Sequence, residues 1–426
     1  MLEWVVDAAH RAGCAEILVV VGHGGEQIRE SIGSSGVSFV TQRRQLGTGH
    51  ALAQIEDHIS EDATLLVLSG DVPLVSAPTL EALLEAAVDS WGAMAVADIE
   101  EPGSLGRVLS SPEGRLDRIV EAADADEATL DVHLVNAGVY ALSAPEIFDY
   151  LRRLEPDNAK GELYLTDALG IAVRDGKTVS LVELEDPSEA FGVNDRLDLA
   201  KVHRELQMRT VQRLMHEGVT ILDPSSTFVD AEVVVDADSV IHPGTSLLGE
   251  TRIGSGCILG QGCWVRNSTI SENSVIEPYS VVDGAEIGPQ CLVGPFARLR
   301  PGTVLVRQAK VGNFVETKNS ILHAGVKAGH LAYIGDAEVG ENANIGAGSI
   351  TCNYDGKKKH RTEIGRGAFI GSDTMLVAPV KIGDGAMTAA GSVISKDVPS
   401  DSLAIERSPQ KHLIGWMTRF KKRISE

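Results

Sequence analysis

Two residues stand where an α/β protein commonly carries its chemistry. Gly70 and Asp71 directly follow the run Thr64–Ser69, whose continuous apolar character is typical of a buried parallel strand. Binding sites in sheets of this kind lie at the carboxyl ends of the strands. A carboxylate at that position could bind a metal ion, although an isolated aspartate there would more often be a turn or helix-capping residue.

A second group of reactive side chains includes His330, Arg300, Lys318 and Lys359. An imidazole titrates near neutrality, so His330 could act as a general base. Three cations suit a dianionic phosphate, and a guanidinium can bind it through two hydrogen bonds. A lone histidine or arginine would more often have a structural or surface role. The inference of a catalytic and phosphate-binding site therefore depends on finding these four residues together.

The elements that must position this second group repeat every six residues. Aliphatic residues stand six apart in three series: Val229, Val235, Ile241, Leu247, Ile253, Leu259 and Val265; Val275, Val281, Ile287, Val293, Leu299, Leu305 and Val311; and Ile364, Ile370, Leu376 and Ile382, resuming at Ile394. One aliphatic residue per six predicts short parallel strands, three to a triangular coil of about 18 residues. In known proteins this pattern belongs to the left-handed parallel β-helix, a fold shared by many acyltransferases. Between Ile350 and Ile364 the period fails, which predicts a loop over Asn353–Thr362, where binding residues tend to concentrate.

The first half of the chain alternates apolar runs with helical spacing. Ile17–Val21 and Thr64–Ser69 are expected as strands, and Glu3–Ala12 and Ala77–Val88 as helices. Alternation of this kind predicts a doubly wound α/β domain. Arg196–Glu217 is expected to be a connecting helix, with Asn194 or Asp195 as its cap.

Composition narrows the class of protein. The formal net charge of −22 argues against a nucleic-acid or anionic-membrane partner, and no apolar run is long enough for membrane insertion. The five cysteines lack CxxC pairs, which favours reduced thiols in the cytoplasm.

Several segments resemble the bifunctional N-acetylglucosamine-1-phosphate uridylyltransferase / glucosamine-1-phosphate N-acetyltransferase family. They occur in the family's order: QLGTGHA (45–51), SGDVPL (69–74), GELYLTDA (161–168), GVNDR (192–196), GPFARLRPG (294–302), VGNFVETKNS (311–320), KAGHLAYIGDAEVG (327–340) and NIGAGSITCNYDGKKKH (344–360). The resemblance implies a Rossmann-like nucleotidyltransferase domain over residues 1–196, a linker helix over 197–217 and a left-handed β-helix acetyltransferase domain over 218–426. It also implies a homotrimer whose acetyl-transfer site is formed between neighbouring subunits.

The resemblance assigns the acetyl-transfer site residue by residue. His330 would be the catalytic base. The sugar-phosphate binders would be Arg300, Lys318, Tyr333, Asn344 and Lys359. Acetyl-CoA would be held by Ala347, Asn353, Tyr354, Ser372, Ala390 and Arg407.

The resemblance likewise assigns a uridylyl-transfer site that binds UTP and the sugar nucleotide with Mg²⁺. Asp71 and Asn194 match the metal ligands, and two protein oxygens completed by phosphates and water suit Mg²⁺. The nucleotide and sugar contacts would be Gln42, Gly47, Thr48, Ser69, Gly70, Asp71, Gly106, Glu121, Asn136 and Asn194.

One departure from the family is large. Members open with a strand and a loop of the form LAAGxGTxM followed by Lys, whereas this sequence opens Met1-Leu2-Glu3-Trp4. The leading hypothesis is acetyl transfer from acetyl-CoA to glucosamine-1-phosphate, then uridylyl transfer from UTP, giving UDP-N-acetylglucosamine. The alternatives are an acetyltransferase with an inactive first domain, a different sugar-1-phosphate nucleotidyltransferase with a regulatory solenoid, and a non-catalytic scaffold.

Overall fold

The computed structural model describes residues 1–32, 36–59, 63–158 and 160–425. They form two compact units, Met1–Leu206 and Gln207–Glu426. Across the described ranges, none of the helices combines the length and the apolar character needed to cross a bilayer.

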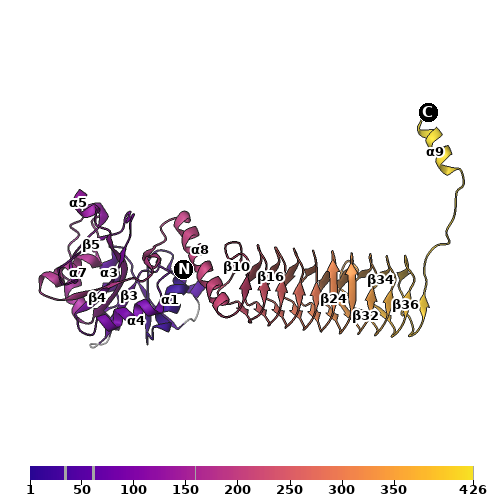
Figure 1. Cartoon of the computed structure of the whole chain (residues 1–426), viewed down its shortest axis with the longest axis horizontal. Coiled ribbons are helices and arrows are strands. Elements are labelled where there is room, and N and C mark those ends of the chain that lie inside the picture. The colour runs from indigo at the N-terminus through magenta and orange to yellow at the C-terminus, as the bar shows by residue number, and fades with distance from the viewer. Residues whose placement is uncertain (33–35, 60–62, 159, 426) are drawn as a thin grey trace. The chain divides into compact units, whose positions relative to one another are not determined.

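The first unit mixes helices and strands (Figure 1). Its helices are α1 (Leu2–Arg11), α2 (Gly25–Ile32), α3 (Thr48–Ala53), α4 (Ala77–Ala86), α5 (Glu127–Leu130), α6 (Glu146–Leu151) and α7 (Leu165–Arg174). Its strands are β1 (Ile17–Val21), β2 (Val37–Thr41), β3 (Thr64–Leu68), β4 (Gly92–Asp98), β5 (Arg107–Ser110), β6 (Leu116–Val120), β7 (Leu134–Ser143) and β8 (Val179–Glu183).

The central sheet of this unit is mixed. Its order is β6-β5-β7-β4-β8, with β3 also pairing with the long strand β7. Strands β4 and β8 run parallel, whereas β3 pairs antiparallel with β7, so the expectation that Thr64–Ser69 forms a parallel strand was wrong. An apolar run indicates a strand but carries no information about the direction of the strand that it pairs with.

Strands β1 and β2 form a separate parallel sheet. In the described residues β1 pairs only with β2 and β3 only with β7. The edges of β1 and β3 line a cavity of about 1300 Å³ that also reaches Ser69, Gly70 and Asp71. The apolar residues of β3 are therefore only partly buried, in contrast to the fully buried residues of β4.

Helix α8 (Arg196–His216) contains the boundary between the two units and agrees with the expected helix Arg196–Glu217 to within one residue. The carboxylate of Asp195 accepts hydrogen bonds from the backbone N–H groups of Leu197 and Asp198, at 2.7 and 2.9 Å. Asp195 therefore caps this helix, and the side chain of Asn194 is left available for another role.

The second unit is the left-handed parallel β-helix that the repeat predicts, with its strands stacked coil upon coil (Figure 1). Three parallel sheets form its sides. Face 1 runs from β9 (Thr220–Ile221) to β38 (Leu403–Ala404), face 2 from β10 (Phe228–Val229) to β37 (Val393–Ile394), and face 3 from β11 (Val234–Val235) to β35 (Val380–Ile382).

The coils differ in length, and this shifts part of the predicted register. Phe228 pairs with Ser246 on the next coil, and Trp264 pairs in the same way with Val281. The sequence separation of the second pair is one residue shorter than that of the first. Consequently Ile276 and Val282 are fully buried, while Val281 is 36% exposed. The prediction that Val275 and Val281 fill the interior was wrong, because a corner one residue shorter than the period turns the following side chains outward.

Candidate active sites

The predicted nucleotide-site residues of the first unit lie in one connected set. Thr48 accepts a hydrogen bond from the backbone N–H of Leu165 at 3.0 Å, and the neighbouring Thr166 hydroxyl donates to Glu121 at 3.1 Å. Glu121 lies against Gly106, where any Cβ would stand 3.3 Å from its carboxylate. The carbonyl of Gly106 accepts from the backbone N–H of Asn136 at 2.9 Å.

The same set continues to the end of β3. The side-chain oxygen of Asn136 accepts from the N–H of Gly138 at 3.0 Å, and Gly138 faces the hydroxyl of Ser69. Ser69, Gly70 and Asp71 then form the turn after the strand. The fold thus gathers on one surface residues from segments that are far apart in the sequence.

Asp71 and Asn194 come together at the end of this surface. The carbonyl of Asp71 accepts from the backbone N–H of Val193 at 2.9 Å, which places Asn194 beside it. Both side chains are exposed, and helix α4 is capped by Ser76 rather than Asp71. One carboxylate and one amide oxygen fit Mg²⁺, which takes few protein ligands and keeps water and phosphate oxygens. Within the described ranges, no group of three or more acidic, His or Cys residues could form a complete metal cage.

Glu121 differs electrostatically from an ordinary surface carboxylate. Burial raises its pKa, and the hydrogen bond from Thr166 only partly opposes that effect. Behind it, burial raises the pKa of Tyr140, whose hydroxyl accepts a 2.7 Å hydrogen bond from the Asn136 amide. Asn136 is therefore held in place from both ends.

The loop at Gln42–Thr48 is shaped by its own contacts. The buried amide of Gln42 donates to the carbonyl of Gly47 at 3.2 Å and lies 2.9 Å from the Nδ1 of His50. Gly47 has φ 112° and lies so close to the backbone of Leu163 that a Cβ would clash. Only glycine fits there, and Gln42 supports the loop while its amide is occupied.

In the second unit, four of the predicted sugar-phosphate residues gather on face 2. Lys318 ends β25 (Glu316–Lys318), and Arg300 follows β22 (Arg298–Leu299) one coil earlier. Tyr333 begins β28 (Tyr333–Gly335) on the next coil, and its hydroxyl lies over Gly335, which pairs with Lys318.

Lys359 is the fourth sugar-phosphate candidate, and its charge affects Lys318. The adjacent ammonium of Lys359 lowers the pKa of Lys318, with Arg300 adding to the effect. Arg300 also donates to the carboxylate of Glu316 at 2.8 Å, which neutralises only part of the positive charge. Like charges this close favour an anionic ligand.

Asn344 does not join that cluster in a single chain. It begins β30 (Asn344–Ile345) on face 1, where it pairs with Lys327 of β27 (Lys327–His330). The cation cluster occupies face 2, so the edge between the two faces separates Asn344 from it.

His330 begins a column along the edge between faces 1 and 2. It stands immediately before the corner residue Leu331, and three predicted acetyl-CoA residues stand before the equivalent corners of later coils. They are Ala347, Ser372 and Ala390. Arg407 extends the column, because its guanidinium donates to the carbonyl of Ala390 at 3.0 Å. Coils are about 4.8 Å apart, so the column could hold an extended ligand of roughly 15 Å.

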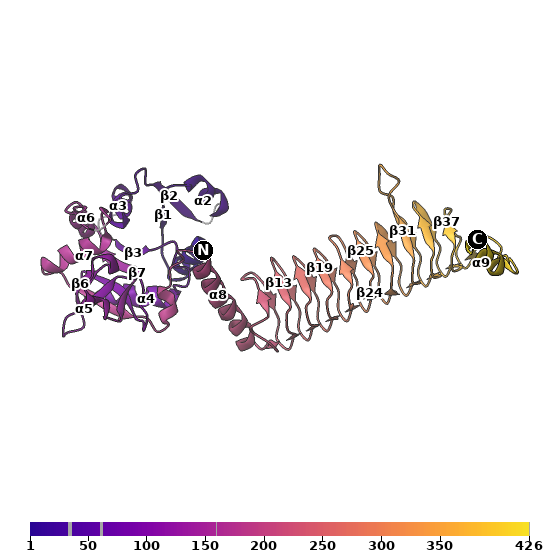
Figure 2. The same cartoon turned by 90° about the horizontal axis from the view of Figure 1, so that it is seen from above.

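The remaining acetyl-CoA candidates lie across face 2 from this column. The loop after β31 (Ile350–Cys352) projects from the solenoid in Figure 2. At its base Asn353 is buried and donates to Asp336, so its amide anchors the loop. Tyr354 is 62% exposed. One chain therefore divides the predicted acetyl-CoA residues between two edges of face 2.

Comparison with known proteins assigns both units. Residues 1–166 match the MobA-like NTP transferase domain, residues 229–315 the GMPPB C-terminal domain, and residues 361–396 the bacterial transferase hexapeptide repeats. The chain is 44% identical to "Bifunctional protein GlmU" of Trichlorobacter lovleyi over 98% of this chain and 91% of the relative. The chain belongs to the GlmU family. Relatives of the same name in Pelobacter propionicus and Heliobacterium modesticaldum are 44% and 46% identical, covering 99% and 96% of this chain and 93% and 90% of theirs.

Membership of the GlmU family identifies the chain as a bifunctional transferase, with nucleotidyltransferase and acyltransferase domains. The matches run through both units, so nothing in the comparisons supports the acetyltransferase-only alternative. The scaffold and the nucleotidyltransferase with a merely regulatory solenoid are excluded by the same family assignment.

The structure adds GlmU residues that the sequence interpretation missed. Thr166, Tyr140 and Gly138 connect Glu121, Asn136 and Ser69. Thr166 lies inside the quoted segment GELYLTDA, so the motif marked its region but not its contact.

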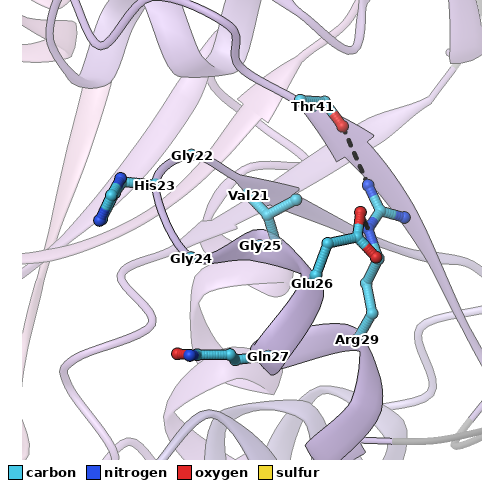
Figure 3. Close-up of a pocket in the computed structure, with 9 residues that line it drawn as sticks. All are labelled: Val21, Gly22, His23, Gly24, Gly25, Glu26, Gln27, Arg29 and Thr41. Atoms are coloured by element: carbon cyan, nitrogen blue, oxygen red, sulfur yellow. Dashed lines mark hydrogen bonds and ion pairs between the residues drawn. The ribbon is translucent and has the colours of Figure 1, made fainter.

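A separate pocket of about 470 Å³ lies after β1, around Gly22–Gln27, and contains no predicted site residue (Figure 3). Its cation Arg29 donates to Thr41 at 2.9 Å and lies 3.8 Å from Glu26. We assign it no role.

Proposed function

We propose that this member of the GlmU family acetylates glucosamine-1-phosphate with acetyl-CoA and then transfers a uridylyl group from UTP to the product, giving UDP-N-acetylglucosamine. The observation that carries the first reaction is the cation cluster of Arg300, Lys318 and Lys359 on the same solenoid as the exposed His330. The connected nucleotide surface ending at Asp71 and Asn194 supports the second.

In the acetyl transfer, the cation cluster binds the sugar phosphate, and Tyr333 lies beside it. His330 removes a proton from the amino group, whose nitrogen attacks the thioester carbonyl carbon. The carbon–sulfur bond then breaks, and the proton held by His330 passes to the departing thiolate. The small side chains of Ala347 and Ala390 leave room for the thioester arm along the edge column, which Ser372 and Arg407 complete.

In the uridylyl transfer, Asp71 and Asn194 are the proposed ligands of Mg²⁺. When bound, the ion would neutralise phosphate charge. Thr48 and Gly47 border the nucleotide, with Gln42 holding their loop. Gly106, Glu121 and Asn136 face the sugar, where the raised pKa of Glu121 favours a close hydrogen bond with a hydroxyl.

We further propose that the protein is a cytoplasmic homotrimer. Asn344 on face 1 and the cation cluster on face 2 can contact one substrate if a neighbouring subunit presents the complementary face. The proposal of a cytoplasmic location rests on the five cysteines, which are all unpaired.

The decisive experiment measures both half-reactions separately, with acetyl-CoA plus glucosamine-1-phosphate and with UTP plus N-acetylglucosamine-1-phosphate. His330→Ala should lower acetyl transfer by about a hundredfold or more and leave uridylyl transfer unchanged. His323→Ala is the matched control, because His323 lies on face 3 and contacts Glu338 at 2.9 Å. Near-normal acetyl transfer by His330→Ala would remove the proposed base.

A further inference from the structure

The loop that carries Lys359 is strongly basic and has little packing of its own. We call residues 354–360, which project from the solenoid in Figure 2, the lysine loop. Three consecutive lysines precede His360, and the only acidic residue of the loop is Asp355. Every residue of the loop except His360 is exposed. Adjacent like charges repel one another, and segments without buried contacts open most easily, so another interaction must keep Lys359 beside Lys318.

Asp355 provides that interaction through hydrogen bonds to the rest of the lysine loop. One carboxylate oxygen accepts from the backbone N–H groups of Lys357 and Lys358, both at 2.7 Å, and the other lies 2.7 Å from Nε2 of His360. The backbone N–H of Asp355 donates to the carbonyl of Lys358 at 3.2 Å. The hydrogen bonds from Lys358, His360 and Lys357 hold the pKa of the Asp355 carboxyl well below its ordinary value. The ionised side chain therefore closes a turn of the kind that aspartate favours.

This turn aligns the two sides of the lysine loop. Tyr354 and Lys359 face each other as an antiparallel pair. The hydroxyl of Tyr354 donates to the carbonyl of Gly356 at 2.7 Å, and Gly356 has φ 94°, a conformation that favours glycine. The position of Lys359 therefore depends on how the turn at Asp355 is closed.

The two ends of the lysine loop are attached to the solenoid without the help of Asp355. The buried amide of Asn353 donates to the carboxylate of Asp336, and the backbone N–H of Thr362 donates to the Asp336 carbonyl at 3.2 Å. The backbone N–H of Asp336 in turn donates to the carbonyl of Lys318 at 3.0 Å. Loss of the Asp355 side chain should therefore release the tip of the loop and leave its ends in place.

We propose that Asp355 is a positioning residue for acetyl transfer, because its carboxylate folds the lysine loop so that Lys359 stands beside Lys318 before the sugar phosphate binds. Asp355 acts through Lys359 and does not itself contact the substrate. A cation pair formed in advance binds the phosphate without the cost of ordering the loop. This inference rests on the proposed function, since it assigns Lys318 and Lys359 to the sugar phosphate.

The test compares Asp355→Ala with Asp355→Asn. Alanine removes all the hydrogen bonds of the side chain, whereas asparagine removes the charge but keeps an oxygen that can accept from both backbone N–H groups. In Asp355→Ala the Michaelis constant for glucosamine-1-phosphate should rise about ten- to a hundredfold at saturating acetyl-CoA, because the loop must then be ordered on binding. Its turnover number at saturation, and both constants of Asp355→Asn, should stay within about threefold of the unchanged chain.

The pKa of Lys318, followed by NMR titration, provides a readout that does not depend on catalysis. Lys359 lowers that pKa, so displacement of Lys359 in Asp355→Ala should raise it. Removal of the Asp355 negative charge alone would act in the opposite direction, so the sign of the change identifies its cause. Asp223→Ala is the matched control, because Asp223 also closes a turn by accepting hydrogen bonds, near the start of the solenoid. It should change neither the Michaelis constant nor the pKa of Lys318.

The outcomes separate this inference from the proposed function. If the unchanged chain does not acetylate glucosamine-1-phosphate, the proposed function is wrong, and the role of Asp355 in it falls as well. If the unchanged chain is active and Asp355→Ala keeps a normal Michaelis constant, only the positioning role is overturned. A higher Michaelis constant without a rise in the pKa of Lys318 would also overturn it. Equal losses in Asp355→Ala and Asp355→Asn would do the same, because they would show that the charge matters and the turn does not.

Discussion

Asn194 and Asp195 are adjacent residues to which the structure gives different tasks. Asp195 accepts two backbone hydrogen bonds at the start of α8, whereas Asn194 lies beside Asp71. Asp195→Ala should therefore lower the free energy of unfolding by about 1 kcal/mol, the usual cost of a lost cap. In a unit of about 200 residues this corresponds to a fall in melting temperature of about 2–4 °C. The Mg²⁺ requirement of the Asp195→Ala variant should not change.

Asn194→Ala should show the reverse pattern. The exposed Asn194 side chain does not cap α8, so the free energy of unfolding should change by less than about 0.5 kcal/mol. Loss of even an indirect metal partner costs about 10–100-fold in affinity, so a direct ligand should cost at least that much. The Mg²⁺ concentration for half-maximal pyrophosphate release from UTP should rise accordingly.

The assay is a Mg²⁺ titration of pyrophosphate release, run beside thermal unfolding of the same samples. Asp195→Ser, which keeps a capping oxygen, should recover most of the stability lost in Asp195→Ala. If Asn194→Ala loses stability while its Mg²⁺ dependence stays normal, Asn194 is a structural residue, and the division of tasks inferred from the hydrogen bonds is wrong.

Three further outcomes follow from the contacts. Lys359→Gln should raise the pKa of Lys318, because a neighbouring positive charge is removed. The Michaelis constant for glucosamine-1-phosphate should increase as Lys318 loses its proton, so in this variant that increase should occur at higher pH. An NMR titration of the Lys318 side chain that shows no upward shift in pKa would contradict the cluster. Val282→Ala should lower solenoid stability in urea by about 2 kcal/mol and Val281→Ala by less than about 0.5 kcal/mol, and equal losses would contradict the register. Hydrogen exchange should be faster in β3 than in β4, because β4 pairs with both β7 and β8 whereas one edge of β3 faces the cavity; equal protection would show that this edge is covered.

The sequence predicted the solenoid well because its information is local. One aliphatic residue per strand and small or polar residues at the corners are enough to specify stacked parallel strands. Where one coil is shorter than the period requires, the prediction placed Val281 inside instead of Val282. Neighbouring residues of a strand face opposite ways, and both were valines, so only the packed coil could distinguish them.

In the first unit the sequence indicated where strands and helices form but not how they pair. β3 was recognisable from Thr64–Ser69, yet its antiparallel partner β7 lies much later in the chain. Pairing depends on contacts between distant segments, and apolar composition does not encode their direction. For the same reason the sequence did not predict Thr166 and Tyr140 as part of the nucleotide surface. Thr166 contacts Glu121, which is distant in sequence, and Tyr140 lies behind Asn136, with which it forms a hydrogen bond.

The sequence by itself determined the residue types available for chemistry, the six-residue period and the family resemblance. Only the tertiary structure decided that Asp195 caps α8 while Asn194 stands beside Asp71. It also decided that Lys359 approaches Lys318, and that the acetyl-CoA residues divide between two edges of face 2. The physical reason is that spacing along the chain specifies local backbone geometry, whereas charge, burial and hydrogen bonding at a site depend on which distant segments the folded backbone brings together.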